Sequence, residues 1–232
     1  MSTTVSPPDD VKFPEPVPGA RTLCRLLMLL TCRLRVIGKE NIPNEQFILT
    51  VNHLSYFDVP AVASQLSRES WIAAFTAKKY KGTWLEPFFH LGSPVWIEQD
   101  SPDRQALAHA IKLIKKGHNF GLAPEGHRSR TASLQTGREG AAFIINRTNV
   151  QVLPVAVYGT EKILKHPRPK VHIVFGKPYR LPEGRAKGPE LTDYTHRIMC
   201  AIAALMPESY HGAYTNHPLL EEMAAVVRPD SL

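Results

Sequence analysis

The sequence predicts a single α/β domain with a largely parallel central sheet flanked by helices, preceded by an N-terminal amphipathic helix. Two observations predict this fold class. From residue 47 onward, short apolar runs rich in β-forming residues alternate with segments of helical periodicity, as in a parallel sheet with crossover helices. The chain has 232 residues and is 43% hydrophobic, which is enough for one sizeable core.

Residues 1–20 are expected to form a flexible, proline-rich arm. Five prolines fall within the first 18 residues, and the segment lacks the basic stretch and apolar run of a secretory signal peptide. We assign no fold to this arm.

Residues 21–36 are predicted to form an amphipathic basic helix. A helical wheel separates leucines from arginines: the leucines are Leu23, Leu26, Leu27, Leu30 and Leu34, and the arginines opposite are Arg21, Arg25 and Arg35. The uncharged run within this helix is far shorter than the ~20 apolar residues that cross a bilayer. Two interpretations remain open: the helix lies in the interface of an anionic membrane, or it packs on the protein's own core.

The strands of the predicted sheet are short apolar runs bounded by turn-forming residues. They are residues 47–51, 71–76, 93–98, 119–123, 151–158 and 171–176. The domain is therefore expected to span residues 37–210, followed by a C-terminal tail at 211–232.

Two helices in this domain have clear sequence signals. The first lies between the third and fourth strands, with Ser101 as its cap, Pro102 at its first position and Gly117 after its end. The second is expected at about 189–206, where apolar residues repeat along one side.

The composition limits the partners and the kind of site. The formal net charge of +7 favours anionic partners, which include phosphorylated small molecules, anionic lipid surfaces and nucleic acid. The three cysteines, Cys24, Cys32 and Cys200, form no Cys-x-x-Cys motif. This argues against a disulfide framework and a structural metal site, so we expect a reducing, cytosol-facing compartment and no metal.

The segment "NHLSYFD", residues 52–58, follows the first predicted strand. In parallel sheets, ligands bind where strands end and turns lead into helices. His53 at such a turn would act as a general base, because imidazole exchanges protons near neutral pH. Asp58 would hold its Nδ1–H. The structural alternative is that Ser55 and Asp58 form a helix-capping box.

The segment "APEGHRSR", residues 123–130, follows another predicted strand. It carries Glu125, a turn glycine and two arginines, and the arginine fork suits a phosphate or carboxylate. The structural alternative makes Arg128 and Arg130 surface charges with Glu125 as an internal ion-pair partner. That alternative does not explain why both segments fall on the same edge of the sheet.

Several segments together resemble the glycerophospholipid acyltransferase family, typified by 1-acylglycerol-3-phosphate acyltransferases. They are "VIGKENIP" (36–43), "NHLSYFD" (52–58), "TAKKY" (76–80), "APEGHRSR" (123–130), "VLPVAV" (152–157) and "VHIVFGKP" (171–178). The match covers roughly residues 36–180, and its most specific part is His-x4-Asp followed by Pro-Glu-Gly-x-Arg-Ser.

The resemblance implies an enzyme of phospholipid biosynthesis that moves an acyl group from acyl-CoA or acyl-carrier protein to a lysophospholipid hydroxyl, without a further cofactor. It implies that His53 is the base and Asp58 its orienter. Substrate binding would fall to Glu125, Gly126, Arg128, Lys78 and the residue at position 99, and Pro154 would lie near the acyl donor. It also implies a peripheral, monotopic location on the cytoplasmic face of the cell membrane, through residues 21–36.

Two departures from the family pattern concern the acceptor. Gln99 stands where the family usually has an arginine that helps to hold the acceptor's phosphate, although Arg104 is a candidate to compensate. His127 stands where a small hydroxylated residue is usual. A lysolipid without a terminal phosphate therefore remains an alternative acceptor.

Rival functions come from other classes of protein. A catalytically silent lipid-binding module would have no reason to keep His53, Asp58, Glu125 and Arg128 together. A nucleic-acid binder would explain the charge, but no recognised motif is present, so we expect no nucleic-acid partner. The chain lacks the Gly-x-Ser-x-Gly elbow of serine hydrolases, and Cys200 lies in an apolar helical pattern typical of a core residue.

Overall fold

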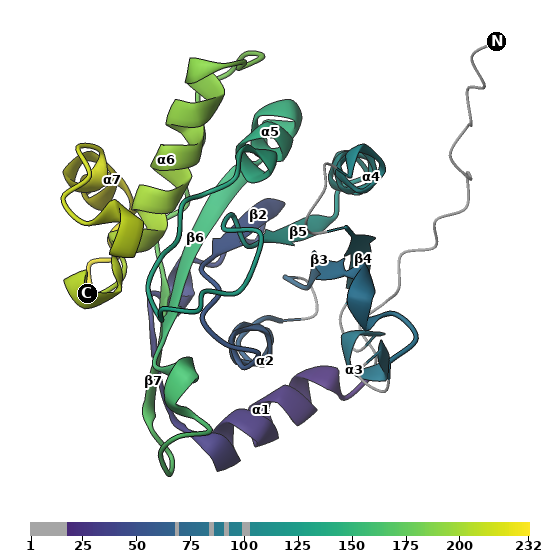
Figure 1. Ribbon diagram of the computed structural model, residues 1–232, viewed down its shortest axis with the longest axis vertical. Helices are drawn as coiled ribbons and strands as arrows, with labels where there is room; N and C mark the ends of the chain where they lie inside the picture. The colour runs from purple at the N-terminus through teal and green to yellow at the C-terminus, as the bar shows by residue number, and fades with distance from the viewer. Residues whose placement is uncertain (1–17, 68–69, 84–85, 91–92, 99–102) are drawn as a thin grey trace.

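The computed structural model describes residues 18–67, 70–83, 86–90, 93–98 and 103–232, which form a seven-stranded sheet with helices on both faces (Figure 1). The strands lie in the order β1-β7-β6-β2-β5-β3-β4. Their bounds are β1 Arg33–Ile37, β2 Phe47–Val51, β3 Ile72–Ala77, β4 Ser93–Ile97, β5 Asn119–Leu122, β6 Gln151–Tyr158 and β7 Lys170–Phe175. The predicted α/β class is confirmed.

Neighbouring strands of this sheet run parallel, except for β6 and β7. Residues 159–169 connect β6 to β7 without a long crossover helix, and such a connection suits an antiparallel pair. The expectation of a largely parallel sheet is therefore confirmed, with one antiparallel step.

The helices form two layers. Their bounds are α1 Ala20–Thr31, α2 Asp58–Ala63, α3 Glu86–His90, α4 Arg104–Lys115, α5 Glu139–Thr148, α6 Pro189–Ala203 and α7 Leu220–Val227. Helices α1 and α2 cover one face of the sheet, whereas α4, α5 and α6 cover the other, with α7 packed outside α6 (Figure 1).

The central strands are buried on both faces, which explains their continuous apolar sequences. In β6, Val152 and Ala156 join the core under α4, α5 and α6, while Leu153, Val155 and Val157 join the core under α1 and α2. Successive side chains point to opposite faces of a strand, so an unbroken apolar run is what a strand between two helical layers requires.

The predicted helix over residues 21–36 is too long at its C-terminal end. Helix α1 ends at Thr31, and residues 33–37 form the edge strand β1. Here exposed Arg33 and Arg35 alternate with half-buried Leu34 and Val36, which is the two-residue period of a strand.

Helix α1 presents its leucines to the outside. Its five leucines are 36–73% exposed: Leu23, Leu26, Leu27, Leu29 and Leu30. The helix is attached through its other side, where Met28 is buried and the Arg25 Nε donates to the Ser64 carbonyl at the end of α2, at 3.0 Å. Helix α1 therefore does pack on the core, as one interpretation expected, but through Met28 and not through its leucine face. Within the described residues, no helix combines the length and apolar character that crossing a bilayer requires.

Helix α4 differs from the expectation at its N-terminal end and agrees with it at its C-terminal end. Asp103 caps the helix by accepting a hydrogen bond from the Ala106 N–H at 2.9 Å, so the helix begins later than expected. Ser101 and Pro102 lie outside the described residues. Gly117 has φ +93° and follows the helix end as predicted, because a left-handed residue there favours glycine.

Residues 211–232 were expected to be a tail, but they belong to the core. Helix α7 packs on α6, and Tyr214, Met223 and Val227 are buried in the core under α4, α5 and α6. The helix expected at 189–206 is α6 and ends three residues earlier, at Ala203.

Candidate active site at the carboxyl-terminal edge

The two sequence segments that carry candidate catalytic residues meet at the carboxyl ends of β2 and β5. These strands are adjacent and parallel, with Thr50 paired to Leu122, so the turns that follow them leave the sheet at the same edge. A hydrogen bond of 2.9 Å from the His53 backbone N–H to Glu125 Oε1 joins the two turns. The prediction that both segments share one edge is confirmed.

His53 and Asp58 form a direct pair. The His53 Nδ1 lies 2.9 Å from Asp58 Oδ2, and the Asp58 side chain is 2% exposed while that of His53 is 26% exposed. Because an ionised carboxylate can only accept, Nδ1 carries the proton in this pair. The His53 Nε2 has no hydrogen-bond partner within the part of the chain that the structure describes, so it is free to accept a proton.

The Asp58 carboxylate is held by three further donors. The backbone N–H groups of Leu54 and Ser55 each donate to Oδ2 at 2.7 Å, and the Thr160 hydroxyl donates to Oδ1 at 2.5 Å. Helix α2 has Phe57 as its N-cap and no side-chain capping bond. The Asp58 side chain accepts from the Ser55 N–H, but Ser55 Oγ accepts from the Phe57 N–H at 3.2 Å, so only the Asp58 half of the predicted capping box is present. The same carboxylate oxygen thus holds the His53 ring and the turn that leads into α2.

Glu125 lies beneath His53 and is 0% exposed. Its Oε1 accepts from the His53 N–H, and its Oε2 accepts from the Gln135 N–H at 2.8 Å. Burial raises the pKa of the Glu125 carboxyl to about 7, although the two backbone N–H groups oppose the shift. Through these two bonds Glu125 joins the turn that carries His53 to the segment that carries Gln135, and its role in acceptor binding stays a prediction. The structural alternative, an internal ion pair between Glu125 and the neighbouring arginines, is not observed among the described residues.

Gly126 makes the turn after Glu125 possible. Its φ is +74°, and a Cβ there would lie 2.7 Å from the Cδ of Arg138. Both the backbone conformation and the close side chain therefore favour glycine. The turn is closed by the Gly126 N–H, which donates to the Ala123 carbonyl at 2.9 Å.

Arg128 is exposed and lies over an aromatic ring beside the site. Its guanidinium carbon is 4.0 Å from the centroid of the Tyr56 ring, and the Tyr56 hydroxyl lies 3.1 Å from the Tyr80 hydroxyl. The hydrogen bond with Tyr80 and the charge of Arg128 lower the pKa of Tyr56. The guanidinium is thus held over the Tyr56 ring, and an exposed arginine in such a position suits an anion.

The other candidate substrate-binding residues are less directly connected to His53. Lys78 ion-pairs with Asp103 at 3.2 Å and with Glu98 at 3.6 Å. Gln99 lies outside the described residues. His127 is exposed in the turn after β5, and Arg104 is exposed at the start of α4.

Two residues that support the site were not identified from sequence. Thr160, in the short 3-10 helix Thr160–Lys162 after β6, holds Asp58 from a distant part of the chain. Asn52 is fully buried, and its side chain exchanges two hydrogen bonds with the backbone of Val157, at 2.7 and 2.8 Å. Its position directly before His53 was the only signal available for Asn52, and Thr160 had none.

Cys200 is a core residue of α6, as predicted. It is buried, and burial raises the pKa of its thiol to about 12. A thiol with so high a pKa is not a nucleophile at neutral pH.

Comparison with known proteins gives one family. The model of the Acyltransferase family matches residues 33–158. The chain is 26% identical over 140 residues to the chloroplastic 1-acyl-sn-glycerol-3-phosphate acyltransferase LPAT1 of Arabidopsis thaliana, covering 57% of this chain and 38% of that protein. It is 22% identical over 160 residues to the 1-acyl-sn-glycerol-3-phosphate acyltransferase of Bacillus subtilis, covering 66% of this chain and 77% of that protein.

A solved structure has a similar fold. The crystal structure of the 1-acyl-sn-glycerophosphate (LPA) acyltransferase PlsC from Thermotoga maritima matches with a TM-score of 0.63 and 26% sequence identity, over 77% of this chain and 74% of that one. The present chain spans well under half the length of its Arabidopsis relative.

Proposed function

Because the chain belongs to the acyltransferase family, we propose that it transfers a fatty acyl group from a thioester donor to the hydroxyl group of a lysophospholipid, with 1-acylglycerol-3-phosphate as the favoured acceptor. The donor is acyl-CoA or acyl-carrier protein. The observation that carries the proposal is the His53–Asp58 pair, an imidazole fixed by a buried carboxylate at the edge of the sheet where ligands bind.

In the proposed reaction His53 is the general base. The acceptor hydroxyl gives its proton to Nε2 while its oxygen attacks the carbonyl carbon of the thioester. The C–S bond then breaks, and the proton on the imidazolium passes to the departing sulfur. Asp58 keeps the proton on Nδ1 and stabilises the imidazolium. A thioester is already activated, so positioning and one base suffice without an enzyme nucleophile.

The acceptor's phosphate would bind Arg128. Its exposed guanidinium, oriented on the Tyr56 ring, supports a charge-assisted contact with an anionic head group. By the family resemblance, Gln99 replaces a second cation there, which keeps a lysolipid without a terminal phosphate as the alternative acceptor. Any contribution from Lys78 has to compete with its ion pairs to Asp103 and Glu98.

The enzyme would work at a membrane surface through α1. An exposed row of leucines on one side of a helix is an apolar surface that water does not favour. The helix itself carries Arg21 and Arg25, and Lys39 lies near them: partial burial together with the two arginine charges lowers the pKa of Lys39. This concentration of cations supports an anionic, cytoplasmic membrane face and a peripheral, monotopic attachment.

A thiol-release assay over a panel of acceptors tests the function. With acyl-CoA as donor, we expect thiol release that depends on lysophosphatidic acid and exceeds the release with lysolipids that lack a terminal phosphate. Acyl-carrier protein is tested as donor in parallel. Faster release with the other lysolipids would select the alternative acceptor.

Two controls separate the proposal from its rivals. If thiol release is absent with every donor and acceptor while lipid still protects the protein from thermal unfolding, the protein is a lipid-binding module. Protection by DNA but not by lipid would instead identify a nucleic-acid binder.

A further inference from the structure

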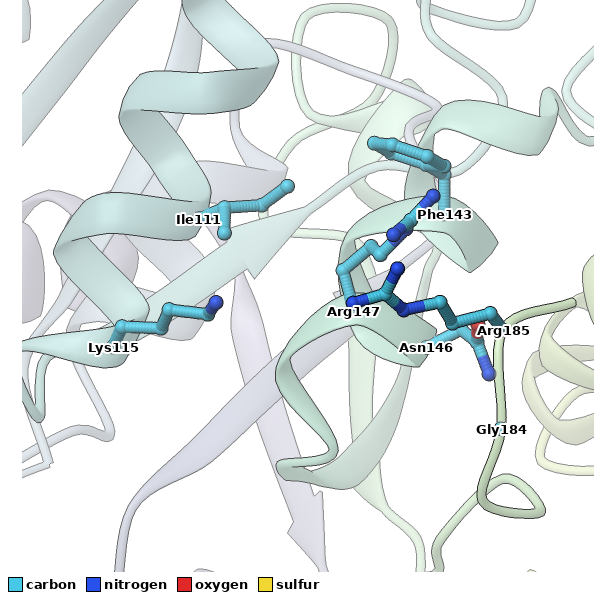
Figure 2. Close-up of a pocket in the computed structure, with 7 residues that line it drawn as sticks. All are labelled: Ile111, Lys115, Phe143, Asn146, Arg147, Gly184 and Arg185. Carbon is cyan, nitrogen blue, oxygen red and sulfur yellow. The ribbon is translucent and has the colours of Figure 1, made fainter.

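A pocket of about 490 Å³ lies between the C-terminal ends of α4 and α5 and the loop before α6 (Figure 2). Helix α4 leads into β5 and α5 leads into β6, so these helix ends lie at the amino-terminal edge of the sheet, opposite the edge that holds His53. The pocket is lined by Ile111, Lys115, Phe143, Asn146, Arg147 and Arg185.

Three cations border this pocket without a carboxylate partner. Within the described part of the chain, no ion pair involves Lys115, Arg147 or Arg185. The Arg147 guanidinium carbon lies 5.1 Å from the centroid of the Phe143 ring, which orients it. Figure 2 shows Lys115 reaching from α4 toward the space that the two guanidinium groups border. Mutual repulsion among uncompensated cations is relieved by a bound anion.

A buried donor in the same pocket also has no partner. Asn146 is 8% exposed, and its amide nitrogen forms no hydrogen bond with any residue that the structure describes, whereas its Oδ1 accepts from the Ala186 N–H at 3.0 Å. Buried donors without a partner are rare in folded proteins, so this one needs an explanation. The same side chain anchors the loop that carries Arg185, which links the donor to the cations.

We propose that this pocket binds a soluble metabolite that carries two or more phosphate charges. Its volume lies in the range of small-molecule sites and is larger than one phosphate ion needs. The arginine forks suit phosphate oxygens, the Asn146 amide supplies a neutral donor, and Ile111 and Phe143 provide an apolar wall for the carbon part of the ligand.

The position of the pocket favours a soluble ligand over a lipid head group. Helices α4 and α5, whose side chains line the pocket, cover the face of the sheet opposite α1 (Figure 1). A membrane that contacts the leucines of α1 would therefore lie on the other side of the protein. The ligand would reach the pocket from water without leaving the aqueous phase.

Titration calorimetry of the full chain with ADP, inorganic pyrophosphate and inorganic phosphate tests the proposal. We expect saturable binding at one site, tighter for ADP and pyrophosphate than for phosphate and weakened by salt. The double variant Arg147→Gln/Arg185→Gln should weaken ADP and pyrophosphate binding about tenfold or more. The single variant Arg185→Gln alters only an exposed side chain and should weaken it less. The control Lys165→Gln/Lys170→Gln removes the same charge from exposed positions and should leave binding unchanged.

Three outcomes would overturn the proposal. The first is that the wild-type chain shows no saturable binding. The second is that the Lys165/Lys170 control loses as much affinity as the Arg147/Arg185 variant. The third is that Arg128→Gln loses affinity while the Arg147/Arg185 variant keeps it, which would mean that the anion binds near His53. Vesicles of phosphatidylglycerol distinguish the two sources of phosphate. Their binding should be unaffected by the Arg147/Arg185 variant, and a matching loss would identify a lipid head group as the ligand.

Discussion

The site around His53 and the outer face of α1 are opposite in one respect. At the site, the buried carboxylates find their partners within the chain: Asp58 accepts from four groups and Glu125 from two. On α1, the leucines find no partner and remain exposed. The described residues satisfy the two carboxylates and so fix the geometry around them, whereas they leave the apolar face of α1 uncovered.

Helix α6 shows what α1 would look like if its apolar face were used inside the protein. Tyr194, Ile198 and Ala201 are buried along one side of α6, as its periodicity predicts. Both helices are amphipathic in sequence, and only the structure says what each apolar face meets. Fully burying one leucine is worth ~1.5–3 kcal/mol, so covering the exposed face of α1 by an apolar surface, such as the proposed membrane, would be strongly favourable.

The largest expected effect on activity comes from removing a side chain of the His53–Asp58 pair. The His53→Ala variant should lower kcat by on the order of 10²–10⁴, with a far smaller effect on donor binding, because the change removes the base and leaves the rest of the chain unaltered. The Asp58→Asn variant should be similarly impaired, since an amide cannot fix the same tautomer. Steady-state kinetics measures both. Retention of more than half the wild-type activity by His53→Ala would refute the mechanism.

The contrast between α1 and α6 is tested by matched truncations. The Ile198→Ala variant should lower the free energy of unfolding by ~2–5 kcal/mol, because it opens a cavity in the core. The Leu29→Ala/Leu30→Ala variant should change it by less than ~0.5 kcal/mol and keep the helix, since alanine is the best helix former. It should nevertheless weaken binding to anionic vesicles about tenfold or more. Loss of stability without loss of vesicle binding would mean that the leucines serve the fold.

Glu125 should make the free energy of unfolding depend on pH. Burial raises its pKa from 4.5 to about 7, so the native state binds the proton more tightly than the unfolded chain does. The resulting stabilisation is fully present below about pH 4.5 and is lost as the pH rises through about 7, by ~3 kcal/mol at most. Denaturant unfolding of wild type and Glu125→Gln over this pH range should show that fall in the wild type alone. If the free energy of unfolding changes with pH in the same way in both proteins, Glu125 is not the source of the pH dependence, whatever the absolute stabilities are.

The smallest effect on activity is expected at Thr160, which contacts Asp58 but not His53. Thr160→Val removes one donor to Asp58 without changing the shape of the side chain, and the loss of one hydrogen bond should lower kcat about five- to tenfold. The acceptor KM should stay near the wild-type value, because Thr160 touches Asp58 rather than substrate. Thr160→Ser should restore most of the rate, and a failure to do so would assign Thr160 a packing role instead.

Local periodicity and strand order made most of the fold predictable. The meeting of His53 with the Glu125 segment followed from two strand ends on one edge, and a His-x4-Asp spacing across a turn placed Asp58 correctly. Strand β1 was missed because Leu34 fits both the helical repeat from Leu30 and the two-residue repeat of a strand, with no glycine or proline to separate them.

The remaining features depend on tertiary contacts that sequence does not encode locally. The burial of Glu125 results from the chain folding over it, and the bond from Thr160 to Asp58 joins residues far apart in the sequence. The outward direction of the α1 leucines likewise depends on which side of the helix meets α2. Each of these required the packed structure.

The pairing of β1 with β7 has a consequence for folding. Arg33 pairs with Lys170, so the edge strand can join the sheet only after most of the chain is in place, because long-range contacts form late. Since α1 continues directly into β1, the two elements should open as one unit before the central strands do. Amide hydrogen exchange should therefore be faster in β1 than in β2. At a membrane, the hydrogen bonds between β1 and β7 would carry the mechanical load between the anchoring helix and the catalytic domain.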